Sequence, residues 1–161
     1  MNMTVEKALQ TIAGICSRRE YCSRDILEKL EAWEIGNEER QKILGYLQQH
    51  KFVDDERFAR VYAEDKFRFN GWGKQKITLM LRQKGIAPDV IARALENIGT
   101  KQYMDRCLEL LRQKLQSLPV EDSYKTRVRL VRFAMGRGFD CDTVYRCLDA
   151  LGEFRHDGDY D

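Results

Sequence analysis

The sequence predicts an all-α protein made of tandem three-helix units, with about nine helices and an elongated, curved shape. Two observations favour this class. Apolar residues recur at helical spacing along the chain, and no segment sustains the alternation that is typical of a strand. Proline, which ends or interrupts helices, occurs only at Pro88 and Pro119. The 161 residues are 43% hydrophobic, which is enough for a chain of small units that share a continuous core.

An internal repeat divides the predicted helices into sets of three. A shift of about 51 residues superimposes apolar positions of the first set on the second: Ile26, Leu30, Ile35, Ile43 and Leu47 fall on Ile77, Leu81, Ile86, Ala94 and Ile98. A further shift of about 53 residues brings Gly85-Ile86 onto Gly138-Phe139. We therefore expect three-helix units at residues 1–51, 52–100 and 101–152, followed by an acidic disordered tail at residues 153–161.

The first unit is predicted from periodicity and capping residues. A first helix runs from Val5 to Ile15, because Ala8, Ile12 and Ile15 share one face. Ser23 and Asn37 can cap the second and third helices, since their side-chain oxygens accept hydrogen bonds from free amides of the first turn. The apolar residues of these two helices are Ile26, Leu27, Leu30 and Trp33, then Ile43, Leu44 and Leu47.

The second unit opens with consecutive acids. Either Asp54 or Asp55 can cap a fourth helix, whose predicted apolar face consists of Phe58, Val61, Tyr62 and Phe69. The alternative interpretation of Asp54-Asp55-Glu56 is a divalent-ion site, but acids at a helix start are far more often caps. A fifth helix with Ile77 and Leu81 follows Gly73 and ends before Gly85, and Pro88 suits the first turn of a sixth.

The third unit is predicted as helices at about Lys101–Leu118, Asp122–Arg137 and Asp140–Leu151. Gly138 and Gly152 stand where glycines that end helices are expected. The sequence thus gives nine helices in three sets.

No arrangement of catalytic residues is recognisable, so we expect no enzyme, no cofactor and no metal. Of the two histidines, His50 ends a helix and His156 lies in the polar tail. The glycine pairs at residues 71–73 and 136–138 lack the Gly-Lys-Ser/Thr that continues a phosphate-binding loop. Five cysteines without a CxxC pair favour reduced thiols in a cytoplasmic protein. The first twenty residues have neither signal-peptide nor membrane-span character.

The distribution of charge indicates a surface for an anionic partner. The net charge is −1 over residues 1–50, +3 over 51–100, +3 over 101–152 and −3 in the tail. In the second unit basic side chains stand among aromatic ones, a mixture that suits single-stranded nucleic acid because bases stack and phosphates pair. The candidate binding residues there are Arg60, Lys66, Arg68, Trp72, Lys74, Lys76, Arg82 and Lys84. The alternative is an ordinary solvated surface over a core that includes Phe58 and Val61.

The third unit holds the densest run of basic residues. Five of them lie on one predicted helix, with no acid among them: Lys125, Arg127, Arg129, Arg132 and Arg137. Arg129 and Arg132 share a face, and Lys125 precedes Arg129 by one turn. Surface helices usually intersperse acids, so this run indicates contact with a phosphate backbone or an acidic groove.

Two adjacent segments resemble a known family. FVDDERFARVYAEDK (Phe52–Lys66), then GWGKQKITLMLRQKGI (Gly71–Ile86), is similar to the signature of the RecX regulatory proteins. That signature has a pair of acids, Phe or Tyr before Ala, then Gly, a basic residue, an apolar residue, Leu and Lys-Gly-Ile. The resemblance covers about Ala8 to Leu151, and its third unit matches mainly by helix pattern.

The family's first repeat is similar to SRREYCSRDILEKL (Ser17–Leu30), with Arg19, Ser23, Leu27 and Leu30 at matching places. The departure is Asp25-Ile26-Leu27, where the family commonly has an acid directly before Leu. The resemblance implies tandem three-helix units, no catalysis and no cofactor. It also implies binding to the RecA nucleoprotein filament on single-stranded DNA, usually as an inhibitor, with roles in recombination, DNA repair and the SOS response. DNA binding by such a protein is plausible, and we expect a monomer with no membrane partner.

Two other classes stay open. A DNA-binding helical module that acts without RecA would explain the basic residues, although few Asn or Gln side chains are placed to read bases. A purely structural helical scaffold is the third interpretation, and an enzyme is the least favoured.

Overall fold

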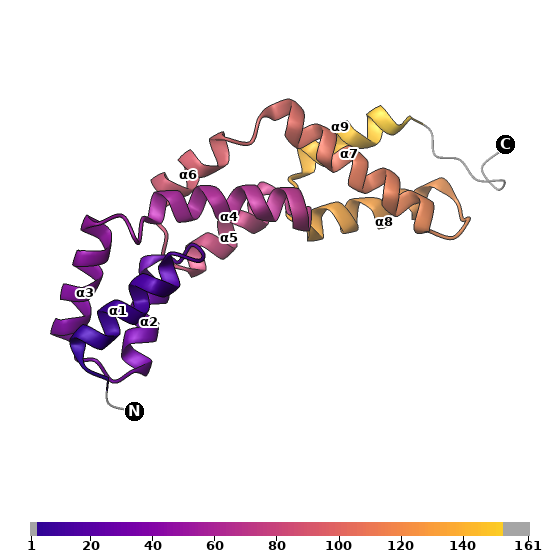
Figure 1. The fold of residues 1–161 in the computed structure, drawn as a ribbon. Coiled ribbons are helices and arrows are strands. Elements are labelled where there is room, and N and C mark those ends of the chain that lie inside the picture. The colour runs from indigo at the N-terminus through magenta and orange to yellow at the C-terminus, as the bar shows by residue number, and fades with distance from the viewer. Residues whose placement is uncertain (1–2, 153–161) are drawn as a thin grey trace. The chain divides into compact units, whose positions relative to one another are not determined.

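The computed structural model describes residues 3–152, so the tail predicted at residues 153–161 lies outside the described residues. Within that range every regular element is an α-helix, as Figure 1 shows. The helices are α1 (Val5–Cys16), α2 (Ser23–Ala32), α3 (Asn37–Gln49), α4 (Asp55–Asn70), α5 (Lys74–Gln83), α6 (Pro88–Glu96), α7 (Thr100–Ser117), α8 (Ser123–Gly136) and α9 (Cys141–Leu151). The predicted all-α class is confirmed.

The chain forms two compact units, each of which combines two stretches of sequence. Of the described residues, unit 1 contains 3–62 and 80–94, and unit 2 contains 63–79 and 95–152. The division falls inside α4 and α5, so each unit includes a part of both helices. The division into three consecutive units at residues 1–51, 52–100 and 101–152 stays a prediction.

The core of unit 1 lies among α1, α2 and α3, with α3 packed against both of the others. Its buried side chains are Ala8, Ile12, Ile26, Leu30, Ile35, Ile43, Leu44, Leu47 and Val53. These include most positions that the periodicity assigned to the first three helices. Local spacing therefore decides which face of each helix is buried here.

The N-termini of α2 and α3 differ from the prediction by one residue. Ser23 and Asn37 are the first helical residues, and Cys22 and Gly36 are the caps. The Ser23 amide donates to Asp55 Oδ1 at 2.7 Å, a partner 32 residues away that a local capping rule does not consider.

Aspartate side chains cap three of the helices, and one of them, Asp54, is among the two caps that the sequence offered for α4. Asp54 Oδ1 accepts from the Arg57 amide at 3.1 Å, and Asp122 Oδ1 accepts from the Lys125 amide at 2.9 Å. Asp140 accepts from the Thr143 amide at 3.0 Å and from its hydroxyl at 2.8 Å. Each bond satisfies a first-turn amide that has no partner within the helix.

The predicted apolar face of α4 is wrong at its end. Phe69 is 76% exposed, whereas Phe67 is 4% exposed and stacks on Tyr103 with ring centroids 5.9 Å apart. Ala63 and Phe67 are both buried and lie one turn apart, so they continue the same face. Phe69 is two positions beyond Phe67, about 200° around the helix, and therefore faces away.

The core of unit 2 lies where α7, α8 and α9 pack against one another. Leu111, Leu130 and Leu148 are almost fully buried there, and Phe139 lies against Tyr103 with ring centroids 5.0 Å apart. This core supports the surface that carries most of the predicted binding residues.

Candidate nucleic-acid and partner interface

The two glycine-rich stretches meet each other in unit 2. The Gly73 amide donates to Arg137 O at 2.7 Å, and the Gln75 amide donates to Gly138 O at 3.0 Å. A Cβ atom at Gly73 would lie 2.4 Å from the Gly138 carbonyl, and one at Gly138 would lie 2.4 Å from Lys76 Cβ. The backbones can approach this closely because neither residue has a side chain.

The start of α5 is therefore not an open anion site. The amides of Gly73, Lys74 and Gln75 all donate to protein oxygens, and the Lys74 amide reaches the hydroxyl of Tyr103 at 2.9 Å. An N-terminus binds anions through amides that have no other partner, and these three are occupied. The glycines join the start of α5 to the turn between α8 and α9.

Trp72 lies between two lysines. The ammonium groups of Lys66 and Lys76 lie 5.0 and 4.6 Å from its ring centroid, within cation–π range. The indole is half-buried, and Phe69 nearby in sequence is exposed. We call Lys66, Trp72 and Lys76 the Trp72 cluster. Three candidate residues that the sequence placed within eleven positions are thus gathered around one ring.

Two other predicted binding residues hold unit 2 together. The guanidinium of Arg137 donates to Asn70 O at 2.8 Å and lies 5.2 Å from the ring centroid of Phe133. The ammonium of Lys74 lies 4.9 Å from the ring of the buried Tyr103. Both side chains are half-buried, so part of their role is to connect helices.

Tyr103 is a neutral anchor beneath this surface. Burial raises its pKa to about 12, against the smaller, opposite effect of the hydrogen bond from the Lys74 amide. The hydroxyl therefore stays protonated at physiological pH and accepts that bond without carrying charge.

On α8, the basic residues differ in how far their charge is compensated. Lys125, Arg129 and Arg132 are exposed, whereas Leu130 and Ala134 of the same helix are buried. Arg129 Nε lies 2.5 Å from Glu121 Oε1, so its charge is paired. Neither the Lys125 ammonium nor the Arg132 guanidinium has an ion-pair partner among the described residues.

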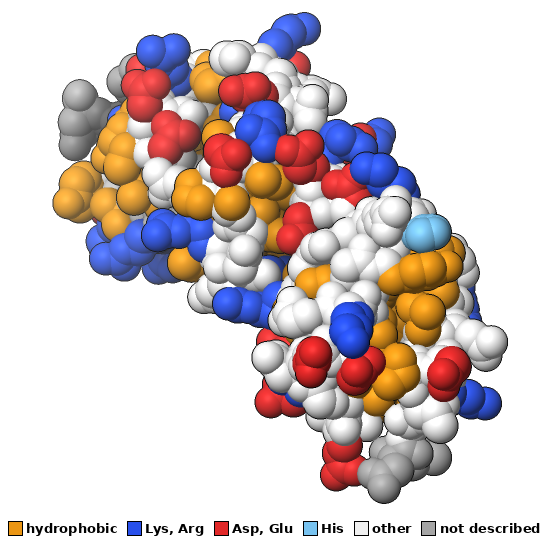
Figure 2. Space-filling model, turned by 90° about the vertical axis from the view of Figure 1, so that its left-hand side faces the viewer, with side chains coloured by type: hydrophobic (Ala, Val, Ile, Leu, Met, Phe, Trp, Pro, Cys, Tyr) orange, Lys and Arg blue, Asp and Glu red, His pale blue; other side chains and the backbone are white. Residues whose placement is uncertain are grey.

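Arg127, the remaining basic residue of α8, packs on an aromatic ring. Arg127 is half-buried and lies 5.5 Å from the ring centroid of Tyr145 on α9. In the view of Figure 2, acidic and basic side chains are interspersed over much of the surface, while Lys and Arg gather at the left, directly below a group of hydrophobic side chains. Individual exposed Lys and Arg side chains, rather than the net charge of the chain, therefore determine how this surface attracts an anionic partner.

The remaining predicted residues are distributed over both units. Arg60 and Arg82 are exposed and belong to unit 1, as does Lys84, whose ammonium lies 3.2 Å from Asp25. Arg68 belongs to unit 2 and pairs with Glu64 at 3.3 Å across one helical turn. The candidate binding residues from Arg60 to Lys84 thus belong to two units.

Arg106 on α7 was missed by the sequence analysis. Its guanidinium donates to the carbonyls of Phe67 at 3.4 Å and Arg68 at 3.0 Å, in the last turn of α4, and to Glu109 at 2.8 Å. It thereby caps carbonyls that have no partner within their own helix. The contacts to α4 span 38 and 39 residues of sequence, so no local pattern indicates them.

The consecutive acids of α4 all have protein partners. Asp54 caps the helix, Asp55 accepts from the Ser23 amide, and Glu56 pairs with Arg93. Among the described residues, no group of three or more His, Cys, Asp and Glu side chains is arranged to hold a metal ion. None of the helices in the described range combines the length and apolar character that a membrane span needs.

The fold and surface define an all-α protein of three-helix units with basic and aromatic side chains on its surface. Residues 54–95 match the domain described as "RecX, second three-helix domain", and residues 101–148 match "RecX, third three-helix domain". The chain belongs to the RecX family.

Relatives and a solved structure agree with this assignment. The regulatory protein RecX of Chlorobium phaeobacteroides is 30% identical over 146 residues, which cover 91% of this chain and 94% of the relative. That of Clostridium botulinum is 29% identical over 86% of this chain, which spans only 64% of the relative's length. The crystal structure of RecX from Lactobacillus salivarius superimposes with a TM-score of 0.84 at 17% identity, covering 91% of this chain and 96% of that one, and supports the fold.

Proposed function

We propose that this chain is a regulatory protein that binds RecA filaments on single-stranded DNA and inhibits their recombinase and ATPase activity. Its relatives carry the name "Regulatory protein RecX", and the proposal follows from membership of that family. The observation that supports it on this chain is the set of surface cations of unit 2, above all Lys125 and Arg132, which are exposed and have no ion-pair partner among the described residues.

In this proposal the protein acts by binding to the filament and catalyses no reaction. A helical body held against the filament blocks the space that incoming duplex DNA or a growing filament end would use. Exposed cations contact phosphates or acidic protein surface, and many such contacts release counterions on binding. Inhibition should therefore weaken steeply as salt concentration rises. The proposed place of action is the cytoplasm, with no cofactor.

The first test is the ATPase rate of RecA on single-stranded DNA, with and without this protein, at two salt concentrations. A decline at substoichiometric amounts that salt relieves would support a filament modulator with electrostatic contacts. An unchanged rate would count against the proposal.

The second test reverses charges on α8. The double variant Lys125→Glu/Arg132→Glu should inhibit RecA much less than the parent, because attraction becomes repulsion at two positions. The matched control is Lys101→Glu/Arg112→Glu, which reverses two exposed charges on α7 of the same unit. Full inhibition by the folded α8 variant would remove this helix from the mechanism.

A second candidate function is DNA binding without RecA. The observation that favours it is the Trp72 cluster with the exposed Phe69, because lysines can pair with phosphates while an aromatic ring stacks on a base. Fluorescence anisotropy of labelled oligo(dT) without RecA measures it directly. Phe69→Ala should weaken binding roughly tenfold if a base stacks on this ring. Strong DNA binding combined with no effect on RecA would favour this alternative.

A further inference from the structure

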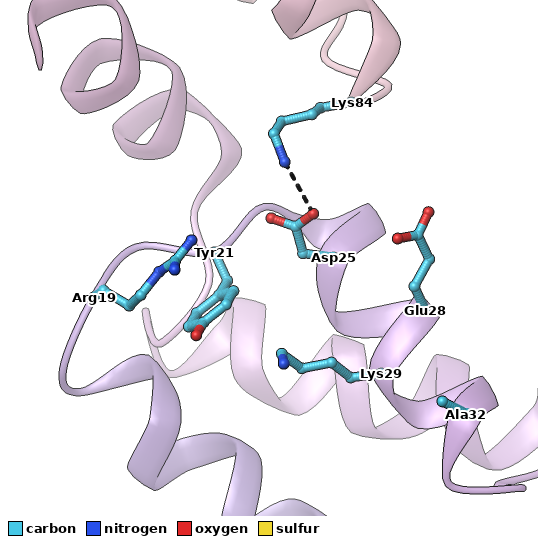
Figure 3. Close-up of a pocket in the computed structure, with 7 residues that line it drawn as sticks. All are labelled: Arg19, Tyr21, Asp25, Glu28, Lys29, Ala32 and Lys84. Carbon is cyan, nitrogen blue, oxygen red and sulfur yellow. Dashed lines mark hydrogen bonds and ion pairs between the residues drawn. The ribbon is translucent and has the colours of Figure 1, made fainter. Parts of the chain in front are cut away.

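Unit 1 contains an open pocket of about 370 Å³, and of the residues that line it the sequence analysis named only Lys84 as a candidate binding residue. Its walls come from the segment before α2, from α2 itself and from the end of α5. Figure 3 shows Arg19 and Lys29 directed toward the ring of Tyr21 at one end and Lys84 directed toward Asp25 at the other. The volume is at the lower end of what small ligands or a few side chains occupy.

The two ends of the pocket differ in charge compensation. Lys84 Nζ lies 3.2 Å from Asp25 Oδ1, so that cation is neutralised by the protein. Arg19 and Lys29 lie 4.4 and 5.3 Å from the Tyr21 ring centroid. Among the described residues, neither has a carboxylate within ion-pair distance. Cation–π contact leaves the N–H groups of both side chains able to donate to an incoming anion.

Both basic and acidic side chains line the pocket, and this mixture favours one class of anionic ligand over another. Glu28 stands on the wall of the pocket away from Tyr21, and Figure 3 shows no ion pair between it and the other labelled residues. A nucleic-acid strand is negative along its whole length, so a strand in this pocket would bring phosphates close to Glu28 and Asp25. A peptide carries negative charge only at its acidic side chains, and its backbone N–H groups can donate to a carboxylate.

We propose that this pocket binds an acidic peptide segment of a protein partner. Side-chain carboxylates of the peptide lie at Arg19 and Lys29. The carboxylate of Glu28 accepts a hydrogen bond from a backbone N–H group of the peptide. Tyr21 supplies the apolar floor and holds both cations in place. This inference goes beyond the proposed function, because it adds a peptide site in unit 1 and depends on neither RecA nor DNA.

The test is an NMR titration of the full-length ¹⁵N-labelled chain with a defined probe, acetyl-Gly-Glu-Asp-Gly-amide. We expect it to shift the Arg19 Nε–H signal and the Tyr21 and Lys29 amides. Acetyl-Gly-Gln-Asn-Gly-amide, inorganic phosphate and oligo(dT) should shift them much less. Arg19→Gln and Lys29→Gln should each weaken the acidic peptide about two- to fivefold, and the double variant about tenfold.

Lys42→Gln is the matched control, because it removes one exposed cation from α3 of the same unit and should leave the affinity unchanged. Thermal unfolding of each variant checks that the fold is retained. The proposal is overturned if the acidic peptide causes no shift, or if the neutral peptide shifts the same signals equally. Equal or stronger shifts with phosphate or oligo(dT) would also overturn it and assign the pocket to phosphates.

Discussion

The close approach of Gly73 and Gly138 gives a quantitative prediction for Gly73→Ala. The added Cβ would lie 2.4 Å from the Gly138 carbonyl and from the Phe139 amide nitrogen, so the backbones must separate by about 1 Å to reach ordinary contact. That separation weakens the hydrogen bonds from Gly73 and Gln75, now 2.7 and 3.0 Å long. Two such bonds contribute about 1–3 kcal/mol, and overpacking adds about 1–3 kcal/mol. We expect a loss of about 1–5 kcal/mol in the free energy of unfolding, after subtraction of the gain of about 0.4–1 kcal/mol from a stiffer unfolded chain.

Urea denaturation followed by circular dichroism measures this loss, and hydrogen exchange of the Gln75 amide shows whether the damage is local. Gly136→Ala is the matched control from the second glycine-rich stretch, since nothing lies within 4 Å of its added Cβ. It should be neutral or stabilising by up to about 1 kcal/mol. If Gly73→Ala is as stable as the parent to within about 0.5 kcal/mol, the reasoning about this backbone contact is wrong.

Three further predictions test separate parts of the structure. Hydrogen bonds to Asp140 lower its pKa below the ordinary 3.8, although burial, the largest single effect, acts in the opposite direction. The ionised Asp140 therefore stabilises the fold fully above the ordinary pKa, and this stabilisation is lost as the pH falls through the lower pKa of the folded state. Asp140→Asn should reduce the dependence of the urea midpoint on pH between about pH 5 and 2. An unchanged pH dependence of the midpoint would contradict this. Phe67→Ala should cost about 3–5 kcal/mol and Phe69→Ala less than about 0.5 kcal/mol in thermal unfolding, and the reverse order would refute the assigned face of α4. Arg57→Ala should cost about 1–3 kcal/mol, because Glu20 loses its 2.7 Å ion pair and its other oxygen is buried without a hydrogen-bond partner among the described residues. Adding Glu20→Gln should recover part of that loss in urea denaturation, and no recovery would argue against an uncompensated carboxylate.

The candidate site could be predicted only in part. Lys66, Trp72 and Lys76 are close in sequence, and the structure gathers them around one ring. Arg137 also lies beside this region, but its guanidinium contacts Asn70, 67 residues away, and helps to join the helices. The pairing of Arg129 with Glu121 spans eight residues, and no helical spacing predicts it because Glu121 precedes α8. Which cations stay free for a partner is therefore a tertiary property.

The sequence by itself determined the helices and most of their ends. Pro88 at the first residue of α6 and the caps at Asp54, Asp122 and Asp140 depend on atoms at most three residues away, so local chemistry is sufficient. Tertiary structure alone decided that Phe67 is buried and Phe69 exposed, and that the two glycine-rich stretches meet backbone to backbone. The physical reason is that a side chain is buried or closely packed only where another helix covers it. The residues that cover it lie tens of positions away in the sequence, so local patterns do not reveal them.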